Sequence, residues 1–167
     1  YFADVALNNS ISFFLPQIVK SFGVSNIQTG FISAVPSVFA TAAVILWAKH
    51  SDARGERRWH TALALLAGGG GLICSTLVKD PGLRIFFLSV ASSGCLAFQG
   101  VFWPIPGAFL TGRAAAGGMA AISAVGIFGG FVAPTFIGYV KDYTGSFAAG
   151  QQAMGMLTIA TAIGLVF

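Results

Sequence analysis

The sequence predicts an all-α polytopic membrane protein, and three observations support this class. Of its 167 residues, 56% are hydrophobic and only 8% are charged, whereas soluble domains carry about 25% charged residues. Six segments reach the roughly 20 mostly apolar residues that a membrane helix needs. The only charge-dense run, Ser51 to His60, is short and lies between two of these segments. So little polar surface implies that most of the protein faces lipid.

The six expected helices occupy residues 1–22, 28–49, 59–78, 83–110, 117–139 and 147–167. The first is the most polar, and the third contains four consecutive glycines, Gly68 to Gly71. Connections such as Lys79-Asp80-Pro81-Gly82 are short and rich in turn-forming residues. Neighbouring helices should therefore run antiparallel, and no space remains for a soluble domain.

Several other classes of protein are disfavoured. The net charge of +4 fits loop Lys and Arg beside anionic headgroups, and the basic residues form no stripe with aromatics, so nucleic-acid binding is not expected. His50 and His60 lack metal-ligand spacing, and no set of nucleophile, base and orienting group is visible. We expect no enzyme activity, no metal and no cofactor.

The chain matches itself weakly at a shift of 90 residues. Ile32-Ser33-Ala34-Val35 then meets Ile122-Ser123-Ala124-Val125, and Asp52 and Gly55 meet Asp142 and Gly145. Each half would hold three helices, and because three is odd, the second triplet would enter the membrane from the opposite side. That arrangement is a 3+3 inverted repeat, as in many secondary transporters. Chance alignment of alanine-rich helices is the alternative.

The basic loop and the chain ends suggest orientation and context. Four basic residues gather around Arg54, which favours the cytoplasmic side for that loop. The chain opens without Met and stops at Phe167 within an apolar run. We expect it to be a piece of a longer protein.

Five short motifs together resemble a known family. They are FFLPQIVK at 13–20, SDARGERRWH at 51–60, WPIP at 103–106, GRAAAGG at 112–118 and GGFVAP at 129–134. In order and spacing they resemble the anion:cation symporter family of the major facilitator superfamily. The resemblance covers nearly the whole chain and matches the C-terminal half, helices seven to twelve of twelve. It implies half of a major-facilitator fold, in the inner membrane of a bacterium.

The charged run resembles the signature turn of that superfamily, between the second and third helix of a half. An acid near a helix end can pair with loop arginines and hold two helices together in one state of the transport cycle. The expected gating loop comprises Asp52, Arg54, Gly55, Arg57 and Arg58. Asp52 would be the acceptor and the arginines the possible donors. Ala53 stands where the family usually has Arg, and a solvated loop that only sets topology is the alternative.

Solute sites of such transporters lie near the midplane, where polar groups are costly in lipid. The candidate substrate-binding residues are Asn8, Asn9, Gln99, Trp103 and Ser123. Asp4, Asn8 and Ser12 share one face at i, i+4 spacing, as do Gln99 and Trp103. Hydrogen bonds between packed helices are the alternative role for each. Asp4 is ambiguous, because it either lines the path or lies wet at the cytoplasmic end.

These observations predict secondary active transport of an organic anion by alternating access, with proton symport. A sugar acid, an aromatic acid and a dicarboxylate all remain open. The expected partners are the organic anion, the proton, the lipid bilayer and the missing N-terminal six-helix half, which by resemblance holds the anion-binding Arg and the proton-coupling acid. The alternative is a non-transporting membrane scaffold or a degenerate transporter remnant.

Overall fold

The computed structural model is entirely helical in the part of the chain that it describes, which is the backbone of residues 1–167 and every side chain except that of Arg113. Six long helices cross the bundle, and a short one follows the fourth. They are α1 (Phe2–Lys20), α2 (Asn26–Arg54), α3 (Arg58–Leu77), α4 (Pro81–Phe102), α5 (Pro104–Phe109), α6 (Gly112–Thr144) and α7 (Ala148–Val166).

Local sequence signals set the helix ends. Ser25 and Gln28 form a capping box at the start of α2, in which each side chain accepts a hydrogen bond from the other residue's backbone N–H. Asp80 caps α4, and Pro81 occupies its first turn. Both α2 and α6 end on a left-handed glycine, Gly55 at φ 62° and Gly145 at φ 71°, a conformation that glycine adopts without steric cost.

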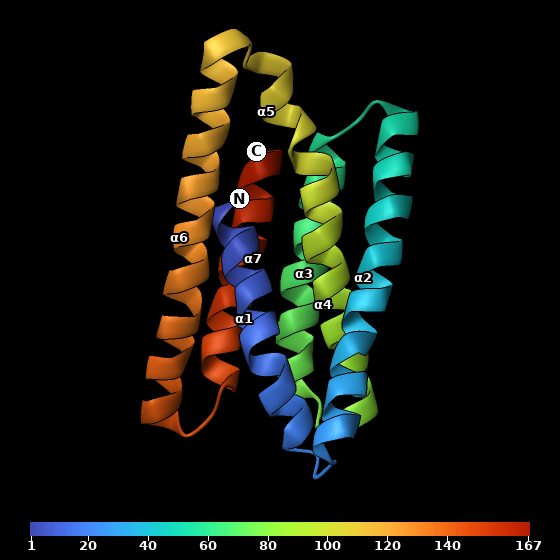
Figure 1. Cartoon of the computed structure of the whole chain (residues 1–167), viewed down its shortest axis with the longest axis vertical. Helices are drawn as coiled ribbons and strands as arrows, with labels where there is room; N and C mark the ends of the chain where they lie inside the picture. The colour runs from blue at the N-terminus through green and yellow to red at the C-terminus, as the bar shows by residue number, and fades with distance from the viewer.

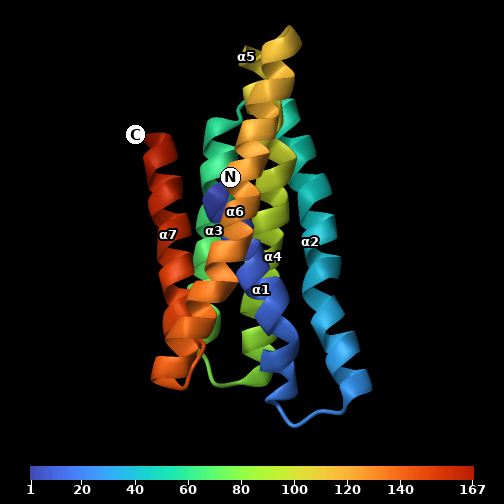
Figure 2. The same ribbon diagram turned by 60° about the vertical axis from the view of Figure 1, so that its left-hand side comes forward.

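The helices form a bundle with two distinct sides (Figure 1). The most extensive contacts join α3 to α4, α2 to α4, α3 to α7 and α1 to α6. In Figure 1, α1 and α4 lie in the middle, flanked by α6 and α2, while α3 and α7 lie behind them. The turned view separates α7 from α2, which lie at opposite edges (Figure 2). The side formed by α6, α1, α4 and α2 is called the front face below.

Glycine lets α3 approach both α4 and α7 closely. A Cβ placed on Gly94 of α4 would lie 2.6 Å from the Ala64 carbonyl oxygen of α3, and one on Gly69 would lie 2.6 Å from the Gly155 carbonyl oxygen of α7. Side-chain carbons do not approach backbone atoms this closely, so these contacts depend on small residues, as is common between membrane helices.

Five helical segments are long and apolar enough to cross a membrane: Asn26–Arg54, Arg58–Leu77, Pro81–Phe109, Ala114–Thr144 and Ala148–Val166. The expected first helix is present as α1, but it is not one of the five, because Asp4, Asn8, Asn9 and Gln17 lower its hydropathy. It is nevertheless well packed, since ten of its residues are buried. A polar helix held within five apolar ones is suited to a bundle with a polar interior.

Three helices have ends that lie well away from the expected ones. Helix α2 continues to Arg54, so the first part of the charged run is helical. The expected fourth helix breaks at Trp103, where Pro104 and Pro106 begin α5. Helix α6 begins at Gly112 instead of residue 117 and continues to Thr144.

The outer surfaces of α2 and α6 are apolar. Phe31 and Val38 on α2, and Ile127 and Phe131 on α6, each expose more than 65% of their surface. A contiguous apolar surface of this kind faces lipid or another protein segment.

Candidate functional site

A buried acid joins the two central helices. Asp4 of α1 is 0% exposed, and its Oδ2 accepts a hydrogen bond of 3.0 Å from Gln99 Nε2 of α4. Its other oxygen, Oδ1, has no hydrogen-bond partner among the described residues. The sequence left Asp4 undecided between a wet helix end and a site in the bundle, and the structure places it in the interior.

The other polar residues of α1 differ in exposure, and Ser10 is fully buried. Asn8 is half-buried and Ser12 is exposed, with the Ser12 hydroxyl 3.5 Å from Asn8 Oδ1. Asn9 donates its amide to the Val5 carbonyl oxygen at 2.9 Å and lies beside Gly130 of α6, where an added Cβ would come within 2.8 Å of Nδ2. In this structure Asn9 therefore packs α1 against α6.

Aromatic rings gather near the Asp4–Gln99 contact. Trp103 lies edge-on to Tyr1, with ring centroids 4.9 Å apart, and to Phe102 at 5.5 Å. Phe102 stacks on Tyr1 at 5.5 Å and on Phe98 at 5.0 Å. The indole of Trp103 is half-buried.

A small cavity lies beside these rings. Its volume is about 450 Å³, and it is lined by Tyr1 and Phe2 of α1, Phe102 of α4, and Ala121, Ile122 and Val125 of α6. The half-buried Ser123 directly follows Ile122 in α6. The structure thus gathers Gln99 and Trp103 with Asp4 and Tyr1 around the α1–α4 contact, while Asn8 and Asn9 lie further along α1.

The charged run forms an ion pair across the α2–α3 turn. Arg57 Nη2 lies 2.7 Å from Asp52 Oδ1, and Gly55 makes the left-handed turn between them. Both side chains are partly exposed, so this pair contributes at most about 1 kcal/mol to stability. Asp52 lies in the last turn of α2, and the sequence had left its partner open among three arginines.

The remaining arginines of the expected gating loop have different surroundings. Arg58 Nε donates to the Leu165 carbonyl oxygen of α7 at 2.7 Å, and its Nη2 donates to the Val166 carbonyl oxygen. It therefore ties the start of α3 to the end of α7, where a cation also complements the helix dipole. Arg54 is exposed on the last turn of α2.

A hydrogen-bonded chain beside this loop was not expected from the sequence. His60 Nδ1 lies 2.8 Å from Glu56 Oε2, and His60 Nε2 lies 2.8 Å from His50 Nδ1. The i, i+4 spacing of Glu56 and His60 was the available signal. Slight burial raises the pKa of Glu56, but hydrogen bonds from the Trp59 N–H and from His60 outweigh it and lower this pKa.

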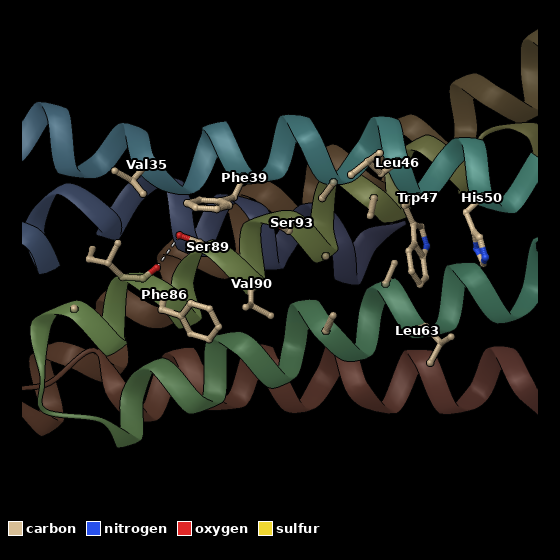
Figure 3. Close-up of a pocket in the computed structure, with 17 residues that line it drawn as sticks. Val35, Phe39, Leu46, Trp47, His50, Leu63, Phe86, Ser89, Val90 and Ser93 are labelled. Atoms are coloured by element: carbon tan, nitrogen blue, oxygen red, sulfur yellow. Dashed lines mark hydrogen bonds between the residues drawn. The ribbon is translucent and has the colours of Figure 1, made fainter.

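A groove larger than the cavity beside Tyr1 lies away from the expected substrate-binding residues, and His50 is among the residues that line it. This groove of about 820 Å³ lies between α2, α3 and α4, with Val35, Phe39, Leu46 and Phe86 among its walls (Figure 3). Its few polar groups include Ser89, whose hydroxyl is already bonded to the Ile85 carbonyl oxygen. None of the five expected substrate-binding residues lines it. We assign it to the apolar flank of the bundle, because a carboxylate would find almost no partner there.

Comparison with known proteins places the chain among transporters. It is 42% identical over 163 residues to a protein of Agrobacterium vitis named as a tartrate transporter. It is 34% identical over 161 residues to a quinolone resistance transporter of Acinetobacter baumannii, and 40% identical over 150 residues to an inner membrane transport protein of Escherichia coli. These alignments cover 98%, 95% and 89% of this chain.

The chain spans 38%, 37% and 34% of the lengths of these relatives. No family model matches the chain. Because the curated relatives are all transporters and the structure has five apolar spans, the chain is a multi-pass integral protein of the bacterial inner membrane and not an enzyme.

Proposed function

Because the chain belongs to the major facilitator superfamily of transporters, we propose that it is the C-terminal half of an organic-anion/proton symporter of the anion:cation symporter family. In this proposal a second six-helix half covers the front face. The solute is bound between the two halves, and both halves rock to expose it to either side of the membrane in turn.

The position of α1 is the observation that supports this proposal most directly. Helix α1 is too polar to be among the five apolar spans. It lies in the middle of the front face, between α6 and α2 (Figure 1). Its half-buried Asn8 and Asn9 and its exposed Ser12 and Gln17 are unsuited to hydrocarbon. A second half enclosing a watery path would give these groups a polar environment.

The element ends support the inverted repeat. A shift of 90 residues carries Arg54, the last residue of α2, onto Thr144, the last of α6, and Arg58, the first of α3, onto Ala148, the first of α7. The repeat relates α1 to α4 and α2 to α6, so the α2–α4 contact corresponds to the α6–α1 contact. Both contacts are extensive. Both middle helices end on a left-handed glycine. These features favour two related triplets, one of α1, α2 and α3 and one of α4, α6 and α7.

The gating proposal assigns a role to the Asp52–Arg57 pair. The pair holds the end of α2 to the start of α3 at 2.7 Å, while Arg58 ties α3 to α7. A partly exposed ion pair is weak, so a rocking motion between the two halves can break and remake it in every cycle. Arg54 is exposed and would contact the second half or the headgroups.

The solute class we favour is a hydroxylated or aromatic carboxylate. Gln99 offers both a donor and an acceptor, and Trp103 offers a flat apolar ring with one N–H donor. The relative named as a tartrate transporter supports a hydroxylated dicarboxylate. The relative named as a quinolone resistance transporter supports an aromatic one, which would make drug export the second candidate function.

The test is uptake by the complete transporter in proteoliposomes. With an acidic exterior and a neutral interior, we expect labelled tartrate to accumulate, and a protonophore to abolish the accumulation because the driving gradient is lost. Liposomes without protein are the control. Quinolone movement without tartrate uptake would favour the second candidate, and movement of neither compound would contradict transport of both proposed solute classes.

A further inference from the structure

The proton of the proposed symport needs a group in the membrane that binds and releases it. From the geometry around Asp4 we infer that the Asp4–Gln99 contact is a proton-binding site between α1 and α4, in addition to any acid of the second half. Only the coupling of this proton-binding site to transport rests on the proposed function. The proton-binding site itself is testable without transport.

The surroundings of Asp4 favour a neutral carboxyl in the closed contact. The side chain is fully buried, only Oδ2 has a hydrogen-bond partner, and Oδ1 has none among the described residues. A carboxylate without a countercharge is very costly in a dry interior, and an acid within a membrane bundle is a functional group by default. Protonation of the carboxyl removes the charge that the site cannot stabilise.

Few other titratable groups lie close enough to Asp4 to bind the proton in its place. The titratable groups that face Asp4 are the Cys95 thiol of α4 and, from α1 itself, the phenol and the amino group of Tyr1. No Lys, Arg or His lies within salt-bridge distance of Asp4 among the described side chains. The amino group of Tyr1 is a backbone group, which would be part of a peptide bond in a longer chain.

Gln99 suits both charge states of the acid. Its amide N–H donates to the ionised carboxylate, and after rotation its carbonyl oxygen accepts a hydrogen bond from the protonated carboxyl. The Asp4–Gln99 hydrogen bond can therefore form whether the carboxyl is ionised or protonated. The ionised form also needs water at Oδ1, and water reaches this atom only when α1 and α4 separate.

This requirement links protonation to movement of α1 against α4. The proton enters from water on the acidic side and binds a carboxylate oxygen of Asp4, which closes the contact. Opening to the other side hydrates the carboxyl, and the proton leaves to that water. No other bond forms or breaks. One proton thus crosses with each cycle at Asp4.

The first test compares two activities of the complete transporter carrying Asp4→Asn. Uptake of tartrate driven by a proton gradient should fall about tenfold or more. Exchange of labelled for unlabelled tartrate should continue, since exchange needs no net proton movement. Ser10→Ala is the matched control, because Ser10 is equally buried on α1 but its hydroxyl bonds only to the Ala6 carbonyl oxygen. It should retain both activities.

Two outcomes of this test would overturn the coupling role. Retention of acid-driven uptake in Asp4→Asn would mean that Asp4 binds no transported proton. The variant would lose uptake and exchange equally, while still eluting as a folded monodisperse protein, if Asp4 contacted the solute or only supported the fold.

A second measurement tests the site even where tartrate is not a substrate. Infrared difference spectra of the wild-type transporter between acidic and alkaline pH should contain the carbonyl band of a protonated carboxyl in an apolar site. The band should shift in Asp4→Glu, disappear in Asp4→Asn and persist in Ser10→Ala. Wild-type spectra that contain no such band, or Asp4→Asn spectra whose protonated-carboxyl bands match those of the wild type in position and intensity, would overturn the proton-binding site itself.

Discussion

Replacing Gly94 with alanine is expected to prevent the complete transporter from accumulating in the membrane. The added Cβ would lie 2.6 Å from the Ala64 carbonyl oxygen and 2.7 Å from the Gly68 Cα, and both are backbone atoms of α3. A flexible side chain could rotate away, but backbone can yield only if the two helices move apart. Overpacking of this kind costs about 1–3 kcal/mol, and the α3–α4 contact is among the most extensive in the bundle.

Gly70→Ala is the matched control, since a Cβ at Gly70 would meet nothing within 4 Å. Both variants add one methyl group to a glycine, one in α4 and one in α3. Membrane abundance, followed by thermal unfolding in detergent, measures the effect. We expect Gly70→Ala to resemble wild type. Equal abundance and equal unfolding temperatures of the two variants would contradict the close packing of α3 and α4.

Replacing Trp103 with alanine is expected to abolish uptake while leaving expression intact. The side chain is half-buried and contacts Tyr1 and Phe102 by ring edges. Its loss removes both a flat surface and a donor for the solute, and misplaced solute contacts can lower rates about 100-fold. Trp103 lies at the junction of α4 and α5, so its removal leaves the close helix contacts at the rear of the bundle unchanged.

Trp103→Phe separates the two contributions of the indole. It keeps an aromatic surface but removes the N–H, so we expect an uptake rate between the rates of wild type and Trp103→Ala. Initial rates over a range of tartrate concentrations, with membrane abundance as the control, give KM and maximal rate. Normal kinetics in Trp103→Ala would contradict the assignment of Trp103 to the solute path.

The regular parts of the fold were predictable because they follow from local sequence. The apolar runs indicate membrane-length helices, and Gly55 and the Asp80-Pro81-Gly82 turn mark ends that depend on a few neighbouring residues. The polar character of α1 was also visible, since Asp4, Asn8 and Gln17 lie within one segment.

The pairing of side chains was less predictable, because it depends on which helices pack together. Asp4 and Gln99 are 95 positions apart, and no spacing rule joins them. Arg57 was one of three possible donors to Asp52, and the choice follows from how Gly55 turns the chain. Gly126, Gly130 and Gly138 stand at multiples of four residues along α6, a pattern that would place them on one contact surface. Gly126 and Gly130 do contact α1, whereas a Cβ at Gly138 would meet nothing within 4 Å.

Accessibility of α1 to water in the complete transporter tests the central claim, which is that the front face lines a watery path beneath a second half. Ser12→Cys, on α1, and Val38→Cys, on the apolar surface of α2, should be treated in intact cells with a membrane-impermeant maleimide. We expect Ser12→Cys to be labelled and tartrate to slow the labelling, while Val38→Cys stays unlabelled. An unlabelled Ser12→Cys, or labelling that tartrate does not change, would contradict the proposed path.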